Sequence, residues 1–177
     1  MAFKKILVAL DRSSQATVVF DQALELAQIQ GSSLMVFHCL SWENEKKTSP
    51  FFGIGTLADV NMYGNLQKLR HESLQRDIEE IRGWLQTYCE QAASKGISAE
   101  LDCKVGNSGS WICDLAQNWR ADLIFLGRRG HKGLSELLLG SVSNYVVHHA
   151  PCSVLIVQGV TNPTGGTPDA TTQVETS

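Results

Sequence analysis

Residues 127–143 read Gly127-Arg128-Arg129-Gly130-His131-Lys132-Gly133-Leu134-Ser135-Glu136-Leu137-Leu138-Leu139-Gly140-Ser141-Val142-Ser143, and this stretch decides the fold. It follows a short apolar run, residues 121–126, that is typical of a buried strand, and it leads into residues 137–149, whose apolar spacing predicts a helix. Glycines in the connection let backbone amides approach a ligand, and unpaired amides at a helix start attract anions. The stretch therefore predicts a strand, a glycine loop and a helix that together receive a phosphate-bearing ligand.

On the amino-terminal side of this stretch, two further β-strands are expected. Residues 6–10 form a continuous apolar run that ends at Asp11, as expected of a strand covered on both faces of a parallel sheet. Ser13 or Ser14 is expected to cap the helix that follows, and Gly31 to end it. Residues 34–40 predict a second buried strand.

The remaining helices and strands are predicted from the spacing of apolar residues, which differs between a helix and a strand. We expect a long amphipathic helix over 66–94, an edge strand over 97–104, a turn and cap over 106–110, a helix over 111–119 and a last strand over 152–157. Residues 41–64 lose periodicity although they contain several apolar side chains, and such long connections are often functional lids, so we expect a mobile insertion. Residues 159–177 are expected to be a disordered tail.

Five strands separated by mostly helical connections predict an α/β fold with a mainly parallel sheet and helices on both faces. The chain has 177 residues, of which 43% are hydrophobic, and this is enough for one domain, which we place at residues 1–158.

Composition also limits the function classes. The net charge of −3 gives no general attraction to nucleic acid or to anionic membranes, and no run of 18 apolar residues occurs, so we expect neither nucleic acid nor membrane as a partner. Five cysteines without a CxxC spacing predict neither a disulfide framework nor a zinc site. With no leader pattern at Met1, the expected location is the cytoplasm.

The glycine spacing carries a family resemblance. Gly127, Gly130, Gly140 and Ser141 form the pattern G-x2-G-x9-G-[ST], which resembles the nucleotide-binding signature of the ATP-binding subgroup of the universal stress protein family. The likeness covers roughly residues 2–158, including the opening run 4–11 and the closing run 151–157. It implies a Rossmann-like domain, of the kind called adenine nucleotide alpha hydrolase-like, with strand order 3-2-1-4-5. It also implies a homodimer paired through the last strand, 152–157, with a role in stress response and a further, unknown protein partner.

The resemblance places an adenine nucleotide, ATP or a related one, at the carboxyl ends of strands one and four. The expected binding residues are Ala9, Leu10, Asp11, Cys39, Gly127, Arg129, Gly130, Gly140, Ser141, Val142 and Ser143. The loop glycines and hydroxyls would hold the phosphates, Asp11 would contact ribose, base or a phosphate-held Mg²⁺ or Mn²⁺, and Cys39 would lie beside adenine. Each of these groups also has a purely structural interpretation. The glycine loop can be a tight turn and Asp11 a helix cap. Cys39 can be a small core residue, and the loop arginines can belong to a solvated face.

One position departs from the family pattern, because Gly106-Asn107-Ser108 stands where members often have Gly-x-Pro. A ligand contact is therefore not expected there, although a helix cap is. Three functions follow from the residues: a nucleotide-binding homodimeric switch, a slow ATP hydrolase, or an interaction protein that needs no nucleotide. No residue is assigned a catalytic role, and the G-x4-G-K-[ST] pattern of a P-loop is missing.

Overall fold

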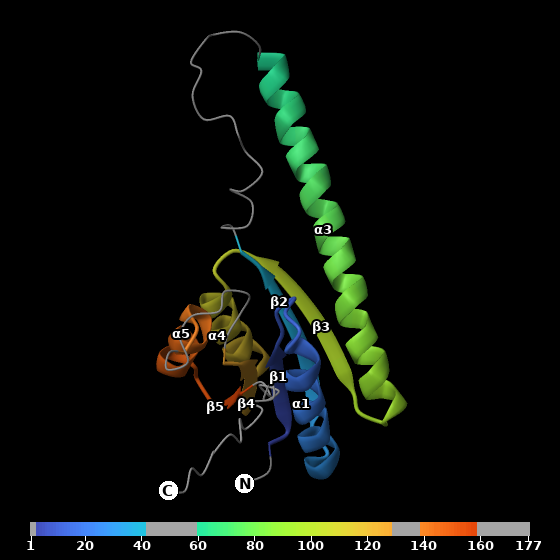
Figure 1. Ribbon diagram of the computed structural model, residues 1–177, viewed down its shortest axis with the longest axis vertical. Helices are drawn as coiled ribbons and strands as arrows, with labels where there is room; N and C mark the ends of the chain where they lie inside the picture. The colour runs from blue at the N-terminus through green and yellow to red at the C-terminus, as the bar shows by residue number, and fades with distance from the viewer. Residues whose placement is uncertain (1–2, 42–59, 129–138, 159–177) are drawn as a thin grey trace, which may run out of the picture.

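A five-stranded parallel sheet forms the centre of the molecule (Figure 1). The computed structural model describes residues 3–41, 60–128 and 139–158. Along the chain the elements are β1 Lys5–Ala9, α1 Ala16–Gln30, β2 Ser33–Leu40, α3 Val60–Ser94, β3 Ala99–Val105, α4 Ser108–Trp119, β4 Leu123–Gly127, α5 Ser141–His149 and β5 Ser153–Val157. The strand order is β3-β2-β1-β4-β5, and every neighbouring pair is parallel, so the predicted fold and order are confirmed.

The sheet is buried on both faces, which explains the continuous apolar runs of its central strands. Along β1, Ile6 and Val8 face a core closed by α1 and α3, whereas Leu7 faces a second core closed by α4 and α5. All three side chains are fully buried. Burying a side chain of this size stabilises the fold by about 1.5–3 kcal/mol, so the central strands contribute strongly to its stability.

The predicted ends of two helices are confirmed, and one predicted cap is wrong. Gly31 ends α1 in the left-handed conformation with φ of 65°, and Asn107 caps α4 by accepting a hydrogen bond from the Ser110 amide at 3.0 Å. The residue at the start of α1 is Gln15, whose side chain makes no capping bond. Ser13 does not cap this helix, because its hydroxyl donates to Asp11 and accepts from the Gln15 amide, which precedes the first residue of α1.

Three helices begin at other residues than the spacing predicted. α4 starts at Ser108 and not at residue 111, directly after its cap Asn107. α3 starts at Val60 and runs through Gly64, so the expected insertion over 41–64 ends earlier than predicted. An interior glycine costs a helix only about 1 kcal/mol, which its neighbours can outweigh. α5 starts at Ser141 and not at residue 137, because Gly140 takes an extended backbone with φ of −60° and ψ of 157°. Residues 42–59 of the insertion and the tail 159–177 lie outside the described residues.

Candidate functional site

The carboxyl ends of β1 and β4 lie side by side, and the strand order reverses between them. Ala9 pairs with Leu126 of β4 on one side and with Phe37 of β2 on the other. Asp11 therefore follows the end of β1 next to Gly127, the last residue of β4. Parallel sheets bind ligands in the crevice at such a reversal. The two sequence features, the opening run and the glycine loop, thus meet at one end of the sheet.

The start of α5 presents backbone amides at this end. The first hydrogen bond within the helix runs from the Asn144 amide to the Gly140 carbonyl at 2.9 Å, so α5 offers no carbonyl to the amides of Ser141, Val142 and Ser143. The Gly140 amide in turn donates to the Arg128 carbonyl at 3.0 Å, which ties the helix start to the end of β4. Ser141 and Val142 are exposed, whereas Ser143 is buried, and the positive end of a helix of this kind is suited to an anion.

Ser143 has a structural role that its position in the motif did not indicate. Its side chain is buried, and its hydroxyl donates to the Gly127 carbonyl at 2.8 Å with a longer contact to the Arg128 carbonyl at 3.3 Å. A hydroxyl has one proton to donate, so the only hydrogen-bond donor that Ser143 can offer a phosphate is its amide. Sequence reasoning treated Ser141 and Ser143 alike, whereas the structure leaves only the Ser141 hydroxyl exposed.

Asp11 combines the two interpretations that the sequence left open. One of its carboxylate oxygens, Oδ1, accepts from the Ser13 amide at 3.1 Å and from the Ser13 hydroxyl, which stabilises the turn after β1. Within the described residues, its second oxygen accepts no hydrogen bond. A half-buried carboxylate with one oxygen fixed and the other open is well suited to accept from a ligand hydroxyl.

The turn after β1 is also fastened to α3, by residues that sequence reasoning did not assign to the site. His38 Nδ1 lies 2.7 Å from the Leu10 carbonyl, and the His38 ring meets the Trp84 ring edge-on at 5.6 Å. The Arg12 guanidinium lies 5.3 Å from the Trp84 ring centre and forms an ion pair with Glu80 at 2.8 Å. No sequence spacing signals these contacts, because they exist only once α3 packs against β2.

Cys39 lies near the end of β2 and is a small residue that packs there. Its Sγ is 3.7 Å from the carbonyls of Leu40 and Gly106. Burial raises the pKa of the Cys39 thiol, and hydrogen bonds to Ser108 and Gly106 oppose that rise only in part. The thiol is therefore neutral at pH 7, which favours the packing role over a nucleophile.

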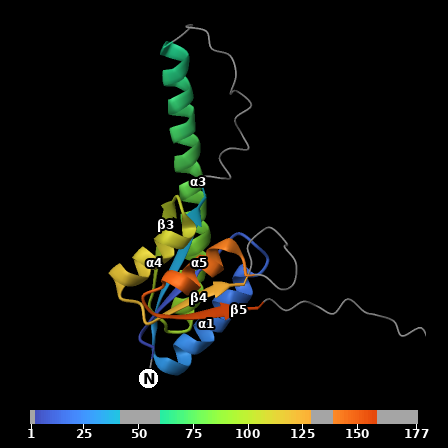
Figure 2. The ribbon, with the colours of Figure 1, turned by 90° about the vertical axis from the view of Figure 1, so that its left-hand side faces the viewer.

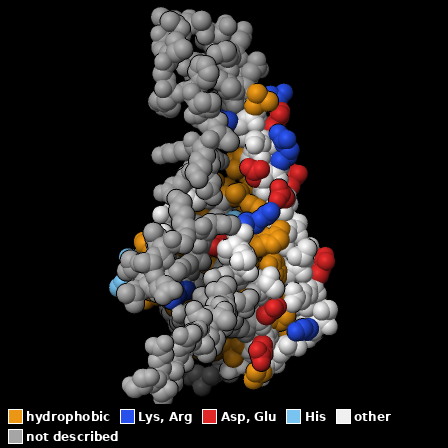
Figure 3. All heavy atoms as spheres, viewed as in Figure 1, with side chains coloured by type: hydrophobic (Ala, Val, Ile, Leu, Met, Phe, Trp, Pro, Cys, Tyr) orange, Lys and Arg blue, Asp and Glu red, His pale blue; other side chains and the backbone are white. Residues whose placement is uncertain are grey.

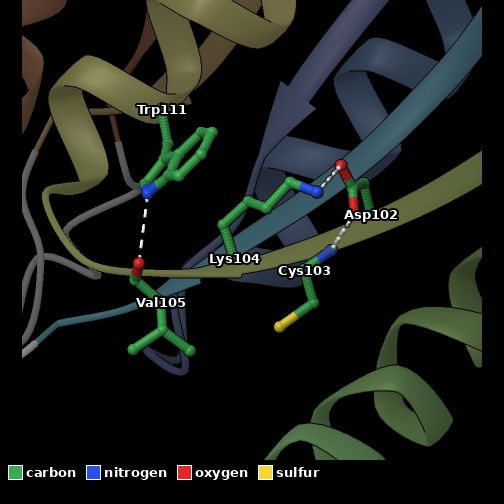
Figure 4. Close-up of polar contacts among 5 residues, drawn as sticks. All are labelled: Asp102, Cys103, Lys104, Val105 and Trp111. Atoms are coloured by element: carbon green, nitrogen blue, oxygen red, sulfur yellow. Dashed lines mark hydrogen bonds and ion pairs between the residues drawn. The ribbon is translucent and has the colours of Figure 1, made fainter.

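The turn between β3 and α4 is held without a proline (Figure 4). Trp111 Nε1 donates to the Val105 carbonyl at 3.1 Å, and Lys104 pairs with Asp102 at 3.2 Å. The Trp111 bond and the Asn107 cap fix the start of α4 at Gly106-Asn107-Ser108, while the Lys104–Asp102 pair lies within β3. Sequence reasoning predicted the cap but not the Trp111 contact.

Several expected features fall outside the site or outside the described residues. Arg129 and Gly130 are not among the described residues, so the structure does not place them. In the described parts of the chain, no group of three or more His, Cys, Asp or Glu side chains is arranged to hold a metal ion. Across the same residues, none of the helices combines the length and the apolar character that a membrane crossing needs.

Comparisons with known proteins point in one direction. The model of the universal stress protein family matches residues 2–158. Universal stress protein Sll1388 of Synechocystis sp. is 46% identical over 160 residues, which are 89% of this chain and 99% of that protein. Universal stress protein UspA from Lactobacillus plantarum has a similar solved structure, with a TM-score of 0.69 and 24% identity over 89% of this chain and 99% of that one.

Two further solved structures of this fold contain a nucleotide. One is a universal stress protein in complex with cAMP, with a TM-score of 0.59 and 21% identity over 89% of this chain and 98% of that one. The other is the universal stress protein from Archaeoglobus fulgidus in complex with dAMP, with a TM-score of 0.55 and 22% identity over 88% and 98% of the two chains. At these identities the likeness establishes a shared fold.

Proposed function

The chain belongs to the universal stress protein family, and we propose that it binds an adenine nucleotide in the crevice at the carboxyl ends of β1 and β4. The observation that carries the proposal is the start of α5, where the amides of residues 141–143 have no carbonyl partner within the helix and lie beside the carboxyl end of the sheet. Two structures that share the fold hold cAMP and dAMP, both adenine nucleotides. ATP, ADP and AMP fit the same set of donors.

Each part of the nucleotide has a matching group in this crevice. The phosphates bind the amides of Ser141, Val142 and Ser143 together with the backbone of Gly140 and Gly127, since a helix start and glycine backbone favour anions. Arg129 and Gly130 of the same loop complete the phosphate contacts. The Ser141 hydroxyl adds a donor, while the Ser143 hydroxyl stays bonded to Gly127.

The nucleoside lies against the ends of β1 and β2. The open oxygen of Asp11 accepts from a ribose hydroxyl, and the turn that carries it is fixed by Ser13. Ala9, Leu10 and Cys39 form the wall beside adenine. A Mg²⁺ or Mn²⁺ that accompanies the nucleotide is held by the phosphates, because Asp11 alone supplies too few protein oxygens for a metal site of its own.

Binding, and not rapid hydrolysis, is the activity that these residues support. The glycine loop lacks the lysine of a P-loop, and the Ser143 hydroxyl is already bonded to the backbone. We therefore expect turnover of ATP to be slow relative to ligand exchange. An interaction protein that needs no nucleotide is the contrasting possibility, and the binding experiment below separates the two.

The second part of the proposal concerns assembly. β5 is the last strand of the sheet, and its residue Leu155 is 36% exposed at that edge. No described strand pairs with the outer edge of β5, and an edge of this kind can pair with a second copy, which gives a homodimer. Because the Arg128 amide donates to the Val157 carbonyl at 2.9 Å, β5 is joined to the phosphate loop, and the nucleotide can act on the dimer through this bond.

The test is the nucleotide content of the purified protein, compared with that of Gly140→Val. The wild type is expected to release an adenine nucleotide on denaturation or to bind added ATP, and the variant to do neither. Gly140 has a φ of −60°, which any residue adopts, so valine should leave the fold intact while its side chain fills the approach to the amides.

A matched control is Gly83→Val, a glycine replacement in α3 where the added Cβ would have no neighbouring atom within 4 Å. This control should keep its nucleotide, and circular dichroism should show that both variants are folded. A wild type that is empty and binds no added adenine nucleotide would make the glycine loop a simple turn and support an interaction protein instead.

A further inference from the structure

Strand β3 is an outer strand of the sheet, and β2 is the only described strand that pairs with it. With seven residues it is longer than β1, β4 or β5, which have five each. Helix α3 runs beside it in Figures 1 and 2, and Leu101 and Cys103 pack on the core that α3 closes. Figure 3 shows charged side chains of both signs on the α3 side of the molecule. The helix covers a face of β3, so the outer edge of this long strand needs a protection of its own.

The bonds between β3 and β2 show which backbone groups of β3 point outward. The Gly106 amide donates to the Leu40 carbonyl of β2 at 2.8 Å. The carbonyl and the amide of one trans peptide unit point in opposite directions, so the Val105 carbonyl, in the same unit as the Gly106 amide, points away from β2. Backbone groups alternate between the two sides of a strand, so the Cys103 amide, two residues before Val105, points away from β2 as well.

Both of these outward groups are hydrogen-bonded to side chains of the same chain, as Figure 4 shows. The Cys103 amide donates to Asp102 Oδ1 at 2.8 Å. The Val105 carbonyl accepts from Trp111 Nε1 at 3.1 Å. A strand of another molecule would have to displace both bonds before it could pair with this part of the edge.

Lys104 connects the two side chains that cover the edge. Its ammonium nitrogen lies 3.2 Å from Asp102 Oδ2 and 5.8 Å from the centre of the Trp111 ring. The two carboxylate oxygens of Asp102 therefore have different partners, one the Cys103 amide and the other the Lys104 ammonium. The side chains of Asp102 and Lys104 are 25% and 39% exposed, so both charges also face solvent. Charged side chains, and lysine above all, are a common means of preventing an edge strand from pairing.

We propose that Asp102, Lys104 and Trp111 close the outer edge of β3 to pairing with a second copy of the chain, which restricts edge-to-edge association to β5. The composition of the two outer strands supports this division. β3 contains three charged residues, whereas β5, Ser153–Val157, contains none. The proposal does not depend on nucleotide binding, and its test is designed to exclude a contribution from β5.

The test measures self-association by sedimentation velocity over a range of protein concentrations. All variants carry Leu155→Lys, which places a charge at an exposed position of β5 so that this edge does not contribute. Asp102→Val removes the acceptor for the Cys103 amide. It is expected to raise the association constant about tenfold, because in a two-fold pair the amides of both copies become available for hydrogen bonds. Trp111→Phe keeps an aromatic ring but loses the N–H that covers the Val105 carbonyl, and it should also raise association.

Two matched variants separate the amide bond from charge and hydrophobicity. Asp102→Asn removes the charge but keeps an oxygen that can accept from the Cys103 amide, so it should associate much more like the Leu155→Lys parent than like Asp102→Val. Glu100→Val makes the same kind of change at an exposed acid two residues away, on the same face of β3, and should leave association unchanged. Circular dichroism at low concentration should show that every variant is folded.

Amide hydrogen exchange locates the contact. In the Leu155→Lys parent the Cys103 amide should be protected at every concentration. In Asp102→Val it should exchange quickly in dilute solution and become protected as the concentration rises, whereas the Lys104 amide, which faces β2, should be protected throughout. The proposal is overturned if neither Asp102→Val nor Trp111→Phe raises association, if Asp102→Asn or Glu100→Val raises it as much as Asp102→Val, or if the added protection lies outside β3.

Discussion

The two ends of the parallel sheet are built in opposite ways. At the amino end, side chains form hydrogen bonds with backbone groups. Asp122 Oδ2 accepts from the amides of Lys4 and Lys5 at 2.8 and 2.9 Å. The Lys5 ammonium donates to the Trp119 carbonyl at 3.1 Å, and the Ser32 hydroxyl donates to the Phe3 carbonyl at 2.6 Å. Polar groups at this end are used to hold the strands in place.

At the carboxyl end, several polar groups near the strand reversal have no partner among the described residues. The amides of residues 141–143 have no carbonyl partner in α5, and one carboxylate oxygen of Asp11 accepts no hydrogen bond from a described residue. The helices here are positioned by packing, since Gly109 of α4 lies directly against the Tyr145 ring of α5. One end of the sheet therefore contributes to stability and the other provides the candidate ligand site. Substitutions at the two ends should have different effects on stability and on binding.

The largest effect is expected from Gly109→Ala at the carboxyl end. A Cβ at this position would lie 2.6 Å from Tyr145 Cδ1, so Tyr145 and the start of α5 must shift. We expect a loss of about 2 kcal/mol in the free energy of unfolding, as for other overpacked sites, together with weaker nucleotide binding. Urea unfolding and calorimetric titration with ATP would measure the two effects.

Gly83→Ala is the control for this substitution. Gly83 is an exposed helical glycine with open space around it, so alanine should stabilise α3 by about 0.5–1 kcal/mol through helix propensity. If Gly109→Ala were as stable as this control, close packing of α4 on α5 would not be what positions the site.

An intermediate effect is expected at the amino end from Asp122→Ala. Loss of two charge-assisted hydrogen bonds should lower the free energy of unfolding by about 1–2 kcal/mol and leave nucleotide affinity unchanged. Ser143→Ala provides the contrast, because loss of its bond to Gly127 should weaken nucleotide binding as well as stability. A nucleotide affinity that falls in Asp122→Ala would contradict the separation of the two ends.

The smallest effect is expected from the cysteine thiols. Burial raises the pKa of Cys39, Cys89, Cys103, Cys113 and Cys152 above the ordinary value of 9.0. Unfolded thiols then ionise at a lower pH than folded ones, so the thiols do not affect the free energy of unfolding below about pH 8 and reduce it as pH rises above about 9. Urea unfolding between about pH 7 and 10 would show a decline, and its slope should lessen in Cys39→Ala.

The same thiols can compare the two ends directly. Cys39 lies near the carboxyl end of β2, whereas Cys152 precedes β5 at the amino end. ATP should slow alkylation of Cys39 by iodoacetamide and leave Cys152 unaffected. Equal protection of both would show that the nucleotide stabilises the whole chain and does not cover Cys39.

Strand positions, their order and the family were predicted correctly from the sequence. Buried strands carry continuous apolar runs, and the family resemblance supplied the order, which the register of β1 with β2 and β4 confirms. Helix starts were predicted less well, because Gly64 and Gly140 look alike in sequence although one lies inside α3 and the other begins α5. Local spacing does not say which glycine takes an extended backbone.

The candidate site was predicted only in part for a similar reason. Glycine and serine spacing placed Gly140 and Ser141 in the candidate loop, although the apolar spacing began the helix at residue 137. The structure begins α5 at Ser141, beside the strand reversal. The buried hydroxyl of Ser143 and the fastening of the β1 turn to α3 by His38, Trp84 and Arg12 had no signal in the sequence. Such contacts join residues far apart in the chain, and their partners are known only after folding.

By itself, the sequence determined the elements that local chemistry controls: apolar runs that must be buried, glycines that end or open helices, and a glycine pattern shared with a family. Only the tertiary structure decided which polar groups are hydrogen-bonded to neighbouring backbone groups and which are not. Asp122 and Ser143 direct their oxygens to backbone groups of neighbouring strands. Among the described residues, one Asp11 oxygen and the N–H groups of residues 141–143 have no such partner. That division depends on which groups the packed helices bring within hydrogen-bonding distance, and hydrogen bonding acts only over such short distances.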